Sequence, residues 1–179
     1  MKTAIQPSLF DTADSEAPVS SNGKESLLRQ LRAQIGCVTT ASPETTETFS
    51  TGADCVDRLL PRGGLRVDGI TEWTADVAGC GAASLAMIAA ATRLNAATGP
   101  LVVVGGEGTF YPPAAVALGV SDDRILWVRP SRHADLVWAI DQSLRCETVA
   151  AVWAHVGPHL DDRDARRFQL AAETGHTPG

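Results

Sequence analysis

Residues 70–85 read ITEWTADVAGCGAASL, and this stretch decides the fold class of the 179-residue chain. Residues 70–73 are rich in β-branched and aromatic side chains, which predicts a short strand. Two glycines follow, and the alanine-rich residues 81–98 then predict a helix with Leu85, Ile88 and Thr92 on one side. A strand that leads through a glycine loop into a helix is the unit from which parallel α/β sheets are built.

Strand and helix patterns continue to alternate along the rest of the chain. Apolar runs predict strands at residues 101–104, 125–128 and 148–153, and helical patterns occupy residues 112–118, 132–144 and 161–173. The strands lack regular polar alternation, as strands buried on both faces do. We therefore predict an α/β fold in which a parallel sheet carries helices on both faces. Three tryptophans within these patterns are predicted to pack in the core: Trp127, Trp138 and Trp153.

Composition narrows the class of protein. Fifteen Lys and Arg face 21 Asp and Glu, giving a net charge of −6, so a broad electrostatic grip on DNA is not supported. A local basic patch in the second half leaves direct DNA contact open as an alternative. The longest apolar stretch is far too short for a membrane span, and the N-terminus has no apolar signal region. The four cysteines have no C-x-x-C spacing, so we expect reduced thiols, no metal site and a cytoplasmic protein.

The N-terminal part differs in amino-acid composition from the rest. Residues 1–22 are rich in small polar residues and predict a disordered tail. Residues 23–48 predict a helix followed by a linker, and residues 49–179 form the main domain. The helix has an apolar stripe that either packs on the core or docks on a partner, and its candidate partner-binding residues are Leu27, Leu28, Leu31 and Ile35.

The glycine loop after residues 70–73 stands where a phosphate-binding loop belongs. A working loop reads G-x-x-x-x-G-K-S/T, in which the lysine contacts the β- and γ-phosphates and the hydroxyl binds Mg²⁺. Gly81 takes the place of the last glycine, after Gly79, but Ala82 takes the lysine position and Ala83 the hydroxyl position. Ser84 comes one residue late. We predict a degenerate nucleotide site, without a cofactor and without enzymatic activity.

The carboxylates that would support metal binding are also missing. Residues 148–155 read TVAAVWAH, with no acid in the second half of the strand. Glu107, just after the strand at residues 101–104, is the remaining acid at a strand end expected to face the loop. We interpret it as a relict acid of the site, more typical of a solvated loop carboxylate than of a catalytic base.

Several segments together resemble RecA-like recombinases and, more closely, the ImuA family of RecA-like accessory proteins. The segment that leads into the phosphate loop of the recombinases resembles three stretches of this chain: residues 49–60 (FSTGADCVDRLL), 62–65 (RGGL) and 69–73 (GITEW). Glu107 matches the position of their water-activating glutamate. Residues 110–115 (FYPPAA), 138–146 (WAIDQSLRC) and 161–173 (DDRDARRFQLAAE) are similar to ImuA proteins. The resemblance covers roughly residues 27–173.

This resemblance implies a RecA-like P-loop NTPase-type core at residues 49–179 and a role as a non-enzymatic adaptor in damage-induced, error-prone translesion DNA synthesis. The implied partners are an inactive Y-family polymerase-like subunit and an error-prone polymerase, together with a RecA-type recombinase or a second copy of the chain. Two alternatives stay open. One is a SulA-type cell-division inhibitor, and the other is a residual RecA-like ATPase.

The resemblance also implies an order of strands. It places residues 148–153 between residues 70–73 and 125–128, with residues 101–104 at the far side. A fifth strand would lie beside residues 70–73, but no strand pattern follows Glu173, so the C-terminal strands of the core are expected to be missing. Residues 70–73 are then expected to form an unprotected sheet edge.

Overall fold

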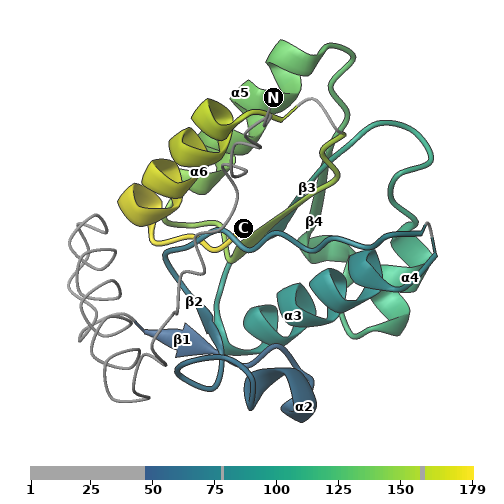
Figure 1. Ribbon diagram of the computed structural model, residues 1–179. Helices are drawn as coiled ribbons and strands as arrows, with labels where there is room; N and C mark the ends of the chain where they lie inside the picture. The colour runs from purple at the N-terminus through teal and green to yellow at the C-terminus, as the bar shows by residue number, and fades with distance from the viewer. Residues whose placement is uncertain (1–46, 78, 158–159) are drawn as a thin grey trace, which may run out of the picture. The chain divides into compact units, whose positions relative to one another are not determined.

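The computed structural model describes residues 47–77, 79–157 and 160–179 (Figure 1). They belong to a unit that spans residues 44–179. The predicted tail and the predicted docking helix, with Leu27, Leu28, Leu31 and Ile35, lie outside the described residues. No helix in the described ranges has both the length and the apolar character needed to cross a membrane.

Three parallel strands form the central sheet. Strand β3 (Leu101–Val104) lies between β4 (Ile125–Val128) and β5 (Ala151–Ala154), and Val103 is in register with both Trp127 and Trp153. All four residues of β3 are buried, as expected for an apolar run in the middle of a parallel sheet. The predicted α/β class with a parallel sheet is confirmed.

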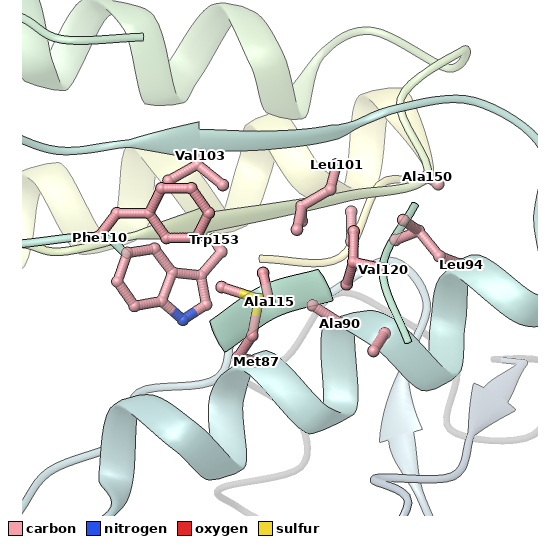
Figure 2. Close-up of a cluster of buried hydrophobic side chains, with 12 residues drawn as sticks. Met87, Ala90, Leu94, Leu101, Val103, Phe110, Ala115, Val120, Ala150 and Trp153 are labelled. Carbon is pink, nitrogen blue, oxygen red and sulfur yellow. The ribbon is translucent and has the colours of Figure 1, made fainter. Parts of the chain in front are cut away.

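Helices cover both faces of this sheet (Figure 1). On one face, α3 (Ala82–Ala96) and α4 (Pro112–Ala117) pack against Leu101 and Val103. Figure 2 shows this cluster, in which Met87, Ala90 and Leu94 of α3 point toward the strands. On the other face, α5 (His133–Leu144) and α6 (Asp162–Gly175) pack against Val102 and Val104. Burial of an aliphatic side chain contributes about 1.5–3 kcal/mol, so these two clusters dominate the stability of the sheet.

Smaller elements precede β3 in the chain or lead into β4. Strand β1 (Thr48–Phe49) pairs antiparallel with β2 (Leu65–Arg66), and the short helix α2 (Asp54–Asp57) lies between them in the chain. The Asp57 carboxylate accepts hydrogen bonds from the backbone N–H and the hydroxyl of Thr51, at 2.9 and 2.7 Å. A single turn of 3₁₀ helix (Asp122–Arg124) leads into β4.

The predicted order of strands is wrong. The resemblance placed residues 125–128 next to residues 148–153, whereas the structure places β3 between β4 and β5. Burial agrees with this order, because the central β3 is buried at every position while the edge strand β4 has an intermediate or exposed side chain at every position. The most apolar strand takes the centre, and the partly exposed strand takes the edge.

Residues after α6 return to the sheet, contrary to the expectation that nothing strand-like follows Glu173. The N–H of Val152 donates to the carbonyl of Pro178 at 2.9 Å. On its other side, Gly179 donates to the carbonyl of Gly69 at 3.1 Å and accepts from the N–H of Thr71 at 2.8 Å. One residue bonded to two residues that lie two apart is the pattern of a parallel pair. Residues 178–179 therefore lie between β5 and residues 69–71. The prediction of a strand at residues 70–73 is wrong, because these residues do not form a regular strand in the structure.

A buried threonine holds this return in place. Thr177 is fully buried, and its hydroxyl lies 3.0 Å from the carbonyl oxygens of both Cys146 and Gly175. His176, with φ of 48°, ends α6 in the left-handed conformation and turns the chain toward the sheet.

The tryptophans divide into two groups. The ring of Phe110 lies 5.4 Å from that of Trp127 and 5.9 Å from that of Trp153, so these two tryptophans pack as predicted. Trp138 does not, because its side chain on α5 is 61% exposed. The residues before and after it, Val137 and Ala139, are buried. Trp138 therefore lies outside the side of α5 that packs on the protein.

Candidate functional site

The glycine loop leads into α3 as its sequence predicts. Gly79 and Gly81 adopt φ of 87° and 91°, a left-handed conformation that strongly favours glycine. Gly81 is the N-cap of α3, and its carbonyl accepts from the N–H of Leu85 at 2.9 Å. An added Cβ would meet no atom within 4 Å at either glycine, so the backbone conformation alone calls for glycine at both positions.

The residues at the phosphate-binding positions lack the side-chain groups that bind phosphate and Mg²⁺. Ala82 and Ala83 are the first two residues of α3, and Ser84 follows them. No side chain caps the helix, and its first turn has no acidic residue. Ala83 and Ser84 are exposed. The first turn of α3 therefore offers backbone N–H groups without the lysine and hydroxyl that hold a nucleotide–Mg²⁺ complex.

A pocket of about 620 Å³ lies under the glycine loop. One wall is the segment 70–75 and the opposite wall is residues 151–156 of β5 and the loop after it. The helical residues that close it are mostly small or apolar, among them Ala86, Ala90 and Phe168. Of the residues that line it, Glu72 alone is acidic, and no lysine or arginine of the described residues takes part.

The five glycine-loop positions predicted as a degenerate nucleotide site are brought together, Ala82 among them. Gly79, Gly81, Ala83 and Ser84 all line the pocket alongside Ala82. The carboxyl end of β5 contributes Ala154, His155 and Val156, so no carboxylate stands where a metal-binding acid would follow the strand.

Glu107 is not part of this pocket, contrary to the expectation that it faces the glycine loop. Its carboxylate is 90% exposed and lies 3.7 Å from the guanidinium of Arg129. Arg129 in turn lies over the ring of Trp127, 5.2 Å from its centroid. This exposed pair sits at the end of β4, so Glu107 is a surface carboxylate paired with Arg129 instead of a group that faces the pocket.

Part of the basic concentration predicted as a local patch forms ion pairs, while Arg163 and Arg166 on α6 are exposed. The carboxylate of Asp141, 3% exposed, accepts from Nε of Arg145 at 3.2 Å and from Nε of Arg167 at 3.0 Å. Burial raises the pKa of Asp141, but the hydrogen bonds from Arg167 and Arg145 outweigh it and hold the pKa below its ordinary value. Arg132 forms a bidentate pair with Asp135. The burial of Asp141 was not predicted from the sequence, although Asp141 lies one turn after Val137 on the buried side of α5.

Arg124 has a structural role that no motif indicated. Its guanidinium donates to the carbonyls of Leu94, Ala97 and Gly99 at 2.8, 2.8 and 2.9 Å. These carbonyls end α3 and begin the turn into β3, so one side chain satisfies a helix terminus that would otherwise need solvent.

Comparison with known proteins adds one observation on the fold. No family model matches the chain, and no curated protein matches it by sequence. Among solved structures, SulA from Pseudomonas aeruginosa is similar, with a TM-score of 0.52 and 14% identity. The similarity covers 61% of this chain and 93% of that one. At this identity the similarity shows a shared fold.

Proposed function

We propose that this chain is a non-enzymatic, RecA-like adaptor of the ImuA type in damage-induced, error-prone translesion DNA synthesis. The observation that carries the non-enzymatic part is the glycine loop. It keeps two glycines in left-handed conformations before α3, but Ala82 and Ala83 stand at the positions of the phosphate-binding lysine and the metal-binding hydroxyl. Such a loop retains its shape without its chemistry, which suits a protein that acts by binding other proteins.

The partners in this proposal are an inactive Y-family polymerase-like subunit and an error-prone polymerase, with a RecA-type recombinase or a second copy of the chain as further candidates. The net charge of −6 favours protein partners over a broad contact with DNA. The use of Arg145 and Arg167 on Asp141 supports the same view, since these guanidinium groups already have a carboxylate partner.

Copurification tests this proposal directly. The tagged full chain is expected to retain the inactive polymerase-like subunit when the two are expressed together. A chain in which Leu28→Glu and Leu31→Glu are combined tests the predicted docking helix, and Ser8→Glu with Thr12→Glu is a matched control of equal added charge. Failure of the unaltered chain to retain the subunit would contradict the proposal.

A SulA-type inhibitor of cell division is the second candidate. The structural similarity to SulA from Pseudomonas aeruginosa, which extends over 93% of that chain, favours it at the level of the fold. The tubulin-like division GTPase is therefore the second bait in the same experiment. Retention of the GTPase and not of the polymerase-like subunit would select this candidate.

A further inference from the structure

The outward faces of α5 and α6 adjoin each other. The two helices pack side by side against the same face of the sheet (Figure 1). They run parallel, because both pairs of ends meet. At the starts, Nε2 of His133 lies 3.9 Å from the carboxylate of Asp164, and at the ends Gly175 of α6 approaches the backbone of Leu144 of α5. Residues in the middle of α5 therefore lie beside residues in the middle of α6.

Two large apolar side chains are exposed in the middle of these helices. Trp138 on α5 is 61% exposed, and Leu170 on α6 is 50% exposed. Asp141 and Arg167, whose ion pair joins the helices, lie three residues after Trp138 and three residues before Leu170. Residues three apart on a helix are neighbours on its surface, so Trp138 and Leu170 flank this ion pair from the two helices.

Unbalanced positive charge surrounds the two apolar side chains. Arg145 and Arg167 share one carboxylate, that of Asp141, so the three groups together carry one positive charge. Arg163 and Arg166 on α6 are exposed, and neither forms an ion pair or a side-chain hydrogen bond with any residue that the structure describes. We call the set of six exposed side chains the α5–α6 surface: Trp138, Arg145, Arg163, Arg166, Arg167 and Leu170.

The other acids of these helices do not cancel this charge. Asp135 forms its bidentate pair with Arg132, before the start of α5. Glu173 lies 3.8 Å from the guanidinium of Arg66, on the side of α6 toward the segment that precedes the glycine loop. Two further acids lie in the first turn of α6, where a negative charge is stabilised by the helix N-terminus. The middle of the α5–α6 surface therefore keeps an excess of cations beside exposed apolar groups.

We propose that the α5–α6 surface binds an acidic segment of a partner protein. An aliphatic or aromatic side chain of this segment packs between Trp138 and Leu170, and carboxylates beside it pair with Arg163 and Arg166. Tryptophan and arginine are the residues that most often dominate the binding energy of an interface. Charge complementarity selects an acidic partner, although the chain itself has a net charge of −6. The inference goes beyond the proposed function and does not depend on which of the two candidate pathways the protein serves.

A single-stranded nucleic acid fits this surface less well than an acidic protein segment. Sites for single strands combine a cationic groove with several aromatic rings on which successive bases stack. The α5–α6 surface presents the ring of Trp138 beside an aliphatic side chain, Leu170, which packs against apolar groups but does not stack on bases.

Peptide selection on the full chain tests the proposal. The probe is a phage-displayed library of random dodecapeptides, and the recovered peptides are sequenced. They are expected to be enriched in Asp and Glu next to Leu, Phe or Trp. The most frequent of them, made as a synthetic peptide, is expected to bind more weakly as the salt concentration rises, because exposed charges are screened. Recovery of peptides without an excess of acids overturns the proposal.

Charge reversal shows where the synthetic peptide binds. Arg163→Glu combined with Arg166→Glu places acids near the start of α6, where they suit the helix dipole, so the fold is expected to be kept. This variant is expected to bind the peptide about tenfold more weakly or worse. Arg58→Glu combined with Arg129→Glu is the matched control, since it changes the charge equally at exposed positions outside α5 and α6 and is expected to keep the affinity. An equal loss with both pairs overturns the proposal.

Trp138→Ala tests the apolar part of the surface. It is expected to weaken the synthetic peptide about tenfold or more, whereas Tyr111→Ala, at a side chain that is 70% exposed before α4, is expected to leave the affinity unchanged. Circular dichroism shows whether each variant keeps the fold. Three outcomes overturn the proposal: unchanged affinity in folded Trp138→Ala, tighter binding of a single-stranded oligothymidylate than of the peptide, and self-association of the unaltered chain that Trp138→Ala abolishes.

Discussion

The guanidinium of Arg167 on α6 donates a hydrogen bond of 3.0 Å to the carboxylate of Asp141 on α5. Arg145, one turn after Asp141 on α5, donates to the same carboxylate at 3.2 Å. The carboxylate is 3% exposed, whereas the two arginine side chains are 44% and 42% exposed. Asp141 is thus a buried anion that joins two helices through partners that reach it from the surface.

Asp141→Asn is expected to lower the free energy of unfolding by about 1–3 kcal/mol, because hydrogen bonds to charged groups are among the stronger ones and a buried neutral amide replaces them poorly. Urea unfolding at pH 7 measures the change. Asp135→Asn is the matched control, since Asp135 also pairs with an arginine but on an exposed surface, and its effect is expected to be clearly smaller. Equal effects of the two substitutions would contradict the structural role of Asp141.

The effect of Asp141 is expected to depend on pH. The arginine hydrogen bonds hold the pKa of Asp141 in the folded protein below its ordinary value of 3.8. The ionised carboxylate therefore stabilises the fold above the unfolded pKa, and this contribution is lost as the pH falls through the lower, folded pKa. Unfolding free energies of the unaltered and Asp141→Asn proteins should differ most near neutral pH and converge in acid. A difference that grows as the pH falls below about 4 would reverse the expected sign.

ATP–Mg²⁺ at millimolar concentration is expected to leave the melting temperature unchanged. A ligand at a hundredfold excess over its Kd stabilises the folded state by about 2.7 kcal/mol, which a thermal shift assay detects readily. Ala82 and Ala83 cannot supply the cation and hydroxyl on which such affinity depends. A clear rise in the melting temperature would refute the non-enzymatic proposal and favour the residual ATPase.

The strands of the central sheet and the helices that cover it follow from local pattern, whereas the strand predicted at residues 70–73 does not form. The run LVVV at Leu101–Val104 and the helix that begins at Ala82 occur where their patterns place them. The order of strands does not follow from local pattern, because it depends on which strands pair with each other in the folded protein. Strands β3 (LVVV) and β4 (ILWV) are both apolar runs of four residues, so the pattern of either strand alone does not tell which one takes the centre of the sheet.

The candidate site was predicted in part for the same reason. Gly79 and Gly81 indicate a loop with left-handed backbone conformations by residue type alone, so the position of the glycine loop before α3 could be predicted from the sequence. Glu107 was not, since the ion pair with Arg129 depends on a residue more than twenty positions away. The return of Pro178 and Gly179 to the sheet was also missed. Proline and glycine are typical of turns, and two residues are too few to show a strand pattern.

Removal of Arg124 is expected to destabilise the protein more than removal of another surface arginine. Arg124→Met retains most of the apolar stem but leaves the carbonyls of Leu94, Ala97 and Gly99 without their donor, which should cost about 1–3 kcal/mol. Arg129→Met is the matched control, because its pair with Glu107 is exposed and pairs of that kind contribute about 0–1 kcal/mol. Denaturant unfolding compares the two, and an equal loss would show that the Arg124 contacts add nothing beyond an exposed ion pair.

Replacement of Gly175, the last residue of α6, is expected to destabilise the protein. A Cβ built there would lie 2.1 Å from the carbonyl oxygen of Leu144 and 2.6 Å from the carbonyl carbon of Arg145, both backbone atoms of the neighbouring helix end. Gly175→Ala must therefore push α6 away from the end of α5, and overpacking of this kind typically costs about 1–3 kcal/mol. The shift would also displace Thr177, whose hydroxyl depends on the carbonyl oxygens of Cys146 and Gly175.

Gly106→Ala is the control for this substitution, because Gly106 has no atom within 4 Å of an added Cβ and does not adopt a positive φ. It is expected to change the melting temperature little. Hydrogen exchange adds a local readout, since displacement of Thr177 should release the amides of Val152 and Thr71, whose acceptors are Pro178 and Gly179. If Gly175→Ala melts like the unaltered protein and keeps both amides protected, α6 and the C-terminal return do not pack against α5 as closely as described.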